Sequence, residues 1–275
     1  MARQLGYSPN LAARALAKGR TNLYAVLTFD FQNPYSVEIT TQLHEIARAE
    51  GAAVISCMVD GDLGAVSAHV DGVVALDYSP KMPEPLHMGA YLALGIFAPE
   101  HTDACLIKFE PAALEAMSLL LRQGRRKIIY VTGEDPLHDD DPRKAAYLTA
   151  MRKACLEPEI LEVPFGNRTS AHQGLARRLV TSRPDAVFCR NDSLALGCLR
   201  ALHEAGIQVP TETAIVGSDG TVDSLYTHPS LTTLAVPFSS ICQGAWKLIQ
   251  ARLEHPEEPT QRLTFEAAFQ PRGTT

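Results

Sequence analysis

Residues 184–210, PDAVFCRNDSLALGCLRALHEAGIQVP, contain the pattern that decides the fold of this chain. A short apolar run, DAVFC, is followed at once by polar residues and then by an amphipathic stretch at residues 193–205. A second short apolar run, TAIVGS, follows at residues 213–218. A strand, a helix and another strand in this order are typical of a parallel sheet whose faces are covered by helices.

The same alternation extends along the rest of the chain. Apolar runs predict further strands at residues 24–29, 52–59, 71–76 and 127–132, and amphipathic stretches predict helices around residues 39–47, 111–123, 143–155 and 171–182. With 275 residues and 46% hydrophobic content, the chain can bury a large core. The pattern therefore predicts an α/β protein with two doubly wound parallel-sheet lobes.

Composition excludes several classes of protein. No stretch reaches the roughly 18 consecutive apolar residues of a membrane-spanning helix, and no export signal opens the chain, so we expect a cytoplasmic protein without membrane contact. Six scattered cysteines without a CxxC pair favour buried thiols over a metal site or disulfides. No nucleophile elbow, phosphate-binding glycine loop or HExxH motif occurs, so we expect neither an enzyme nor a cofactor.

The N-terminal segment at residues 5–22, LGYSPNLAARALAKGRTN, is basic on a chain whose net charge is −6. Ser8 and Pro9 suit the start of a short helix and Gly19 suits its end. No acidic residue precedes Asp30, which favours contact with phosphate groups. From charge and periodicity alone, an exposed amphipathic N-terminal helix is the preferred interpretation.

The order of the residues adds a resemblance to a known family. LGYSPNLAARALAKGRT resembles the junction between the DNA-binding domain and the hinge helix in LacI-family bacterial transcription regulators. The segments DFQNPYSVEI (30–39), VDGVV (70–74), RKIIYVTG (126–133), AIVGSDG (214–220) and HPSLTTLAVP (228–237) follow in the order of that family, as does the 184–210 block. The resemblance therefore covers nearly the whole chain, although the helix-turn-helix of the family is not found in it.

The resemblance implies a periplasmic-binding-protein-like core of type I with a short N-terminal hinge helix. It assigns residues 1–20 to the end of the DNA-binding domain and the hinge, residues 21–133 and 238–258 to an N-terminal lobe, and residues 134–237 and 259–275 to a C-terminal lobe. It also implies a homodimer in which a small ligand, bound in the cleft between the lobes, controls binding to operator DNA. The implied DNA contacts are Asn10, Ala13, Arg14, Leu16 and Lys18. The alternative function is a stand-alone sugar-binding protein of the same fold.

Polar residues that follow the predicted strands are the candidates for ligand binding, because open α/β sheets bind ligands beyond the carboxyl ends of their strands. Their carboxylate and amide groups suit the hydroxyl groups of a small polar metabolite such as a sugar or a sugar derivative. The resemblance adds an arginine at the start of the helix that follows RKIIYVTG. The candidates are Asn33, Tyr35, Arg143, Asn191, Asp192 and Asp219.

Each candidate also has a structural interpretation. Asp192 or Ser193 suits the start of a helix at Leu194, Asp219 suits a turn beside Gly220, Tyr35 suits packing between the lobes, and Arg143 suits a solvated helix start. The run HDDD at residues 138–141 resembles a metal site, but consecutive carboxylates rarely converge on one ion. A polar loop that leads into a helix at Asp141 and Pro142 is the preferred interpretation, and we predict no metal.

Two departures from the family pattern bear on the fold and on the ligand site. The segment CMVDGDLGAVSAHVDG at residues 57–72 is shorter than usual, so we expect the second helix of the N-terminal lobe to be reduced or lost. Lys108 and Phe109 stand where an Asp-Asn pair is common in the family, which predicts a ligand site that differs from that of its relatives.

Overall fold

A computed structural model describes residues 19–59, 66, 68–77, 89–134 and 140–275. The chain divides into two compact units, each built from three segments. The first unit comprises Met1–Gln32, Ser36–Leu106 and Phe238–Thr264, and the second comprises Asn33–Tyr35, Ile107–Pro237 and Phe265–Thr275. The proposed hinge helix and DNA contacts at residues 10–18 lie outside the described residues, as do residues 60–65 and 67 of the shortened segment at residues 57–72.

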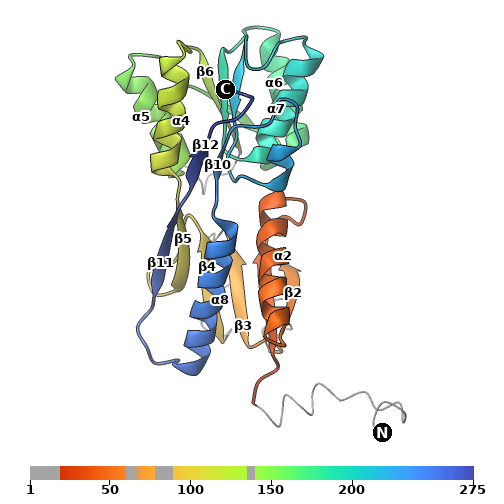
Figure 1. The fold of residues 1–275 in the computed structure, drawn as a ribbon, viewed down its shortest axis with the longest axis vertical. Helices are drawn as coiled ribbons and strands as arrows, with labels where there is room; N and C mark the ends of the chain where they lie inside the picture. The colour runs from red at the N-terminus through yellow and green to blue at the C-terminus, as the bar shows by residue number, and fades with distance from the viewer. Residues whose placement is uncertain (1–18, 60–65, 67, 78–88, 135–139) are drawn as a thin grey trace, which may run out of the picture. The chain divides into compact units, whose positions relative to one another are not determined.

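The first unit contains a six-stranded sheet in the order β11-β5-β4-β3-β1-β2. Its strands are β1 (Leu23–Thr28), β2 (Ala53–Met58), β3 (Gly72–Leu76), β4 (Ala90–Gly95), β5 (Asp103–Lys108) and β11 (Arg262–Glu266), of which β1 to β5 pair in parallel. Figure 1 shows helices α2 (Pro34–Ala49) and α8 (Phe238–Glu254) side by side over the strands. Trp246 of α8 joins them, because its indole donates to Glu50 (2.8 Å) and packs edge-on against Tyr24 of β1.

The second unit contains a parallel four-stranded sheet in the order β7-β6-β8-β9. Its strands are β6 (Ile128–Gly133), β7 (Glu159–Val163), β8 (Ala186–Cys189) and β9 (Ala214–Val216). Figure 1 shows two helix pairs beside them, α4 (Glu110–Arg122) with α5 (Pro142–Lys153), and α6 (Arg168–Leu179) with α7 (Asp192–Glu204). Two short strands, β10 (Thr233–Ala235) and β12 (Ala268–Gln270), pair antiparallel, and the single turns η4 (Pro164–Gly166) and η5 (Val222–Leu225) complete the unit.

Alternation along β6 and β8 explains why helices cover this sheet. Ile129, Val131, Val187 and Cys189 form one apolar cluster with residues of α6 and α7. Tyr130 stacks on Tyr147 of α5, and Phe188 packs edge-on against Tyr130. The two faces of the sheet therefore contact different helices, as a parallel sheet that is buried on both sides requires.

The structure confirms the predicted fold class and the predicted strands and helices, with ends that differ by a few residues. The apolar strands β4 and β5 and the helix α8 were not predicted. The predicted lobe boundary at Gly133 differs from the structure. Apart from Asn33–Tyr35, the chain passes from the first unit to the second between Leu106 and Ile107. The reason is that β6 pairs with β7 and β8, so the residues from α4 to β6 belong to the second sheet.

None of the helices in the described part of the chain combines the length and the apolar character needed to cross a bilayer. All six cysteines are free thiols, and Cys105, Cys189, Cys198 and Cys242 are buried.

Candidate functional site

A network of charged side chains lies at the carboxyl edge of the four-stranded sheet. Asp141 is the N-cap of α5, and its carboxylate accepts hydrogen bonds from the backbone N–H (2.8 Å) and Nε (2.9 Å) of Arg143 and from Nη2 of Arg143 (2.7 Å). Arg190, which follows β8, donates through Nε to Oδ2 of Asp141 (2.9 Å). One buried carboxylate therefore fixes two arginines that come from different parts of the chain.

The charges of this network shift the pKa values of its members. Burial alone would raise the pKa of Asp141, but the charges of Arg143 and Arg190 and the hydrogen bonds from Arg143 outweigh it and hold the pKa well below its usual range. Burial would lower the pKa of Arg143, but the adjacent Asp141 raises it above its usual value. Both groups are therefore charged at neutral pH. Because Arg143 is buried and paired with Asp141, it is not a solvated residue at the helix start.

Arg143 also contacts the loop that follows β9. Its Nη1 lies 3.3 Å from Oγ of Ser218 and 3.7 Å from Oδ1 of Asp219. Its guanidinium carbon lies 4.3 Å from the centre of the Phe109 ring, within the range of a cation–π interaction. Phe109, one of the two departures from the family pattern, is therefore a packing partner of a candidate ligand residue.

Asp219 has a strained backbone. Its φ is 115°, a region that residues with a Cβ rarely occupy. Its N–H donates to Leu234 (2.9 Å), and its carbonyl accepts from Val236 (2.9 Å), so contacts with the β10 segment hold this conformation. Strained residues of this kind cluster at functional sites, where the surrounding structure imposes the conformation.

Asn191 and Asp192, at the start of α7, have different roles. Asn191 is the N-cap, and its Oδ1 accepts from the N–H of Leu194 (2.8 Å). Asp192 is fully buried; its Oδ2 accepts from the N–H (2.8 Å) and the hydroxyl (3.1 Å) of Thr221, and its Oδ1 accepts from the hydroxyl of Thr233 (2.7 Å). The capping role that the sequence suggested for Asp192 or Ser193 therefore belongs to Asn191, and Asp192 ties the Asp219 loop to α7 and β10.

The environment of Asp192 is unusual for a carboxylate. Burial raises its pKa to about 6, against the opposing effect of the hydrogen bonds from Thr233, Thr221 and Gly220. A side chain at Gly217 would collide with Oδ1 of Asp192, so the first glycine of GSDG makes room for this carboxylate. The Asp219 loop is therefore positioned by a group that changes its protonation slightly below neutral pH.

Two further sequence candidates lie after β1. Asn33 accepts through Oδ1 from the N–H of Tyr35 (3.1 Å) at the start of α2, and Tyr35 is buried. Both belong to the second unit together with Arg143, Asn191 and Asp219. Asn33 and Asn191 thus use their oxygen as a helix cap, while their amide N–H groups donate to no acceptor in the part of the chain that the structure describes.

Sequence reasoning missed Arg190 and Tyr130. Arg190 follows the AVFC strand directly and meets the criterion that selected Asn191, so its position was a usable signal. Tyr130 is fully buried, and its hydroxyl has no hydrogen-bond partner among the described residues. Burial raises its pKa, and the charges of Asp141, Arg143 and Arg190 are close enough to affect it. No signal in the strand IIYVTG distinguishes this tyrosine from an ordinary core residue.

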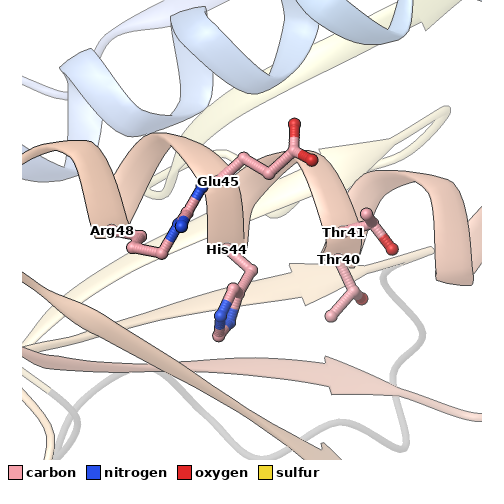
Figure 2. Close-up of a pocket in the computed structure, with 5 residues that line it drawn as sticks. All are labelled: Thr40, Thr41, His44, Glu45 and Arg48. Atoms are coloured by element: carbon pink, nitrogen blue, oxygen red, sulfur yellow. The ribbon is translucent and has the colours of Figure 1, made fainter.

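A separate hollow lies on helix α2 of the first unit. Figure 2 shows the five residues that line it, all from α2: Thr40, Thr41, His44, Glu45 and Arg48. None of the sequence candidates is among them. In the described residues, no group of three His, Cys, Asp or Glu side chains could hold a metal ion. Of the HDDD run, His138 and Asp139 lie outside the described residues, and Asp141 has the helix-start position that the sequence predicted.

Comparisons with known proteins agree with this architecture. Residues 117–275 match the family of periplasmic binding protein-like domains. The transcriptional regulator PtxS of Pseudomonas aeruginosa (strain PAO1) is 30% identical over 99% of this chain and 84% of its own length. The ribose operon repressor of Escherichia coli (strain K12) is 27% identical over 99% of this chain and 88% of its own length.

A solved structure has the same fold. The LacI family transcriptional regulator from Enterococcus faecium, with bound ribose, superposes with a TM-score of 0.83 and 24% identity, over 92% of this chain and 98% of that one. The match to the domain family covers more than half of the chain. The two relatives are transcriptional regulators that align with nearly the whole chain. The chain therefore belongs to the LacI family of bacterial transcriptional regulators and contains the periplasmic-binding-protein-like effector-binding core of that family.

Proposed function

We propose that this chain binds a small polar metabolite, a sugar or a sugar derivative, at the carboxyl edge of its four-stranded sheet, and that ligand occupancy controls its binding to operator DNA. The observation that carries the proposal is the convergence of Arg143, Asn191 and Asp219 on one edge, from the starts of two helices and from a strained loop. Such an edge is where open α/β sheets bind ligands. The site serves binding, and no catalytic turnover is proposed.

The available groups suit hydroxyl-rich ligands. The amide N–H groups of Asn33 and Asn191 are donors that the helix caps leave unused. The contacts of Arg143 with Ser218 and Asp219, at 3.3 and 3.7 Å, are long enough for a ligand oxygen to replace them. We propose that Tyr35 packs against the ligand and that Asp192 contributes by holding the Asp219 loop. The names of the relatives support a sugar, since one is a ribose operon repressor and a structural neighbour contains ribose.

The DNA side of the proposal rests on the basic N-terminal segment. We propose that Arg14 and Lys18 contact phosphates, that Leu16 enters the minor groove, and that Asn10 and Ala13 line the same contact. A regulator of this family acts on chromosomal DNA, so we assign the protein to the cytoplasm. The relatives that are named as repressors support negative control of transcription.

We also propose that the protein forms a homodimer. The turn η5 and the residue after it expose three large apolar side chains, Val222 (53%), Leu225 (55%) and Tyr226 (84%). Exposed apolar side chains that are grouped on one short segment are typical of contact surfaces. A Tyr226→Asp variant should shift the protein from dimer to monomer at micromolar concentration, as measured by analytical ultracentrifugation. Val180→Asp, at a lone exposed valine after α6, is the control and should remain dimeric.

A thermal-shift screen tests ligand binding. Sugars, sugar phosphates and nucleobases are added to the wild type and to Asp219→Ala, with Glu115→Ala on the exposed face of α4 as the control. A hit should raise the melting temperature of the wild type and of the control. In Asp219→Ala the shift should shrink, because loss of one buried hydrogen-bonding group weakens binding by roughly ten- to a hundredfold. Equal stabilisation of all three proteins would reject the site.

A further inference from the structure

Arg190 differs from Arg143, the other arginine of the network, in the hydrogen bonds that its guanidinium makes. Its backbone N–H donates to Val131 (2.9 Å), which extends the pairing of β8 with β6, and its Nε donates to Asp141. Asp141 is itself fixed by three hydrogen bonds from Arg143. The orientation of the Arg190 side chain is therefore set in advance, so a ligand that binds it pays little of the usual cost of ordering an arginine.

The terminal Nη1 and Nη2 groups of Arg190 are unused. Among the described residues they donate to no acceptor, although only 17% of the side chain is exposed. By contrast, the equally covered Arg252 directs both of its Nη groups to acceptors, including Asp103 and the carbonyl of Pro256. Neither Nη group of Arg190 is among the buried polar atoms without a partner in the described residues, so both reach solvent and are open to a ligand.

The paired N–H groups at the end of a guanidinium match the two oxygens of a carboxylate. The charges nearby favour a ligand with one negative charge: Asp141 and Asp219 balance the charges of Arg143 and Arg190, and Asp141 is occupied mainly by Arg143. A doubly charged phosphate monoester would bring a second negative charge close to the carboxylates of Asp141 and Asp219. Hydroxyl groups of the same ligand would meet Asn191 and Asp219.

We propose that Arg190 is a specificity-determining residue that binds the carboxylate of the ligand, so that the effector is a sugar acid and not a neutral sugar. The inference rests on the proposed binding site and adds the chemical class of its ligand. Arg190 acts through a direct ionic contact, whereas Asp141 acts by orienting it.

The test measures binding of matched neutral and acidic sugars by isothermal titration calorimetry at pH 7.5. The panel contains D-glucose, D-gluconate, D-glucuronate, D-glucose 6-phosphate, D-ribose and D-ribonate, and the proteins are the wild type, Arg190→Gln, Arg190→Lys and Asp219→Ala. Arg200→Gln, at an exposed arginine of α7, is the control. We expect the wild type to bind an acid at least tenfold more tightly than the matching neutral sugar.

Arg190→Gln should lose that preference, with a tenfold or larger drop in affinity for the acid. Arg190→Lys keeps the charge opposite Asp141 but lacks the paired donors, so its affinity for the acid should fall several-fold. Because this variant keeps the ion pair with Asp141, it also shows whether Arg190→Gln lost binding only through misfolding. The inference is overturned if the wild type prefers a neutral sugar or the phosphate, or if Arg190→Gln still binds the acid with wild-type affinity. If the sugar that binds in such a case no longer binds to Asp219→Ala, the proposed function survives. Absence of binding to the whole panel contradicts both.

Discussion

The turn after β1 and the carboxyl edge of the four-stranded sheet carry similar polar residues but hold them in different ways. In the turn, the Thr28 hydroxyl donates to Ser36 (3.1 Å), Asp30 accepts from the N–H of Gln32 (2.7 Å), and Asn33 caps α2, all within nine residues of sequence. At the sheet edge, Asp192 binds partners 29 and 41 residues away, and Arg143 contacts a serine 75 residues away.

The polar side chains of the turn are therefore positioned by neighbours in the sequence, whereas those of the sheet edge are positioned by residues far away in the sequence. The polar groups of the turn contact one another within a short segment, so their placement depends mainly on local sequence. The sheet edge buries charges, and a buried charge is tolerated only when its partners are already in position. We therefore expect substitutions at the sheet edge to affect the fold strongly and equivalent substitutions in the turn to affect it weakly.

The largest effect is expected for Asp141→Asn. The substitution leaves Arg143 and Arg190 without their shared counter-charge, and breaking a buried ionic contact costs about 3–5 kcal/mol of unfolding free energy. The exposed Asp30→Asn is the matched control and should change stability by less than about 0.5 kcal/mol. Urea denaturation followed by circular dichroism measures both. Similar small losses in the two variants would show that the sheet edge is no more cooperative than the turn.

A pH dependence is expected from Asp192. Its pKa in the folded protein is raised to about 6, so the folded state binds this proton more readily than the unfolded state, and the contribution of the group to stability increases as the pH falls through 6. Between pH 7.5 and 4.5, the wild type should gain about 2 kcal/mol relative to Asp192→Asn. Asp141, whose pKa is lowered, loses its contribution only below about pH 4, so this range separates the two. A difference that does not change with pH would contradict the assignment.

Much of this fold was readable from the sequence because the signals are local. The runs DAVFC and TAIVGS, and the helix that begins near Ser193, follow from periodicity, and polar residues after strands mark the edge where ligands bind. Asp141 was predicted as a helix start for the same reason. The lobe boundary was misplaced because only hydrogen bonding between strands shows that β6 belongs to the second sheet.

The contacts within the site were not readable in the same way. Nothing in the order of residues shows that Asp192 reaches Thr233, or that Asp141 is shared by Arg143 and Arg190, because these partners are brought together by the sheet topology. Phe109 was recognised as a departure from the family pattern, but its contact with the guanidinium of Arg143 appears only in the folded chain.

A smaller effect is expected from the backbone of Asp219. Asp219→Ala and Asp219→Gly both remove the carboxylate near Arg143, but only glycine relieves the strain at a φ of 115°. The glycine variant should therefore be more stable than the alanine variant by about 1 kcal/mol. Differential scanning calorimetry of the two variants measures this difference directly. If alanine were as stable as glycine, the strain at Asp219 would be negligible and its conformation would carry no argument for a functional site.

The smallest effect is expected for Tyr130→Phe. The hydroxyl of Tyr130 is buried without a hydrogen-bond partner in the described part of the chain, so its removal should leave the unfolding free energy unchanged or raise it by up to about 1 kcal/mol. Tyr147, which stacks on Tyr130, is the matched control, because its hydroxyl donates toward the carbonyls of Ile128 and Glu159 and accepts from the N–H of Glu159. Tyr147→Phe should lose about 1–3 kcal/mol in the same urea denaturation. Equal losses of stability in the two variants would contradict this expectation, because they would mean that the Tyr130 hydroxyl forms a stabilising polar contact in solution.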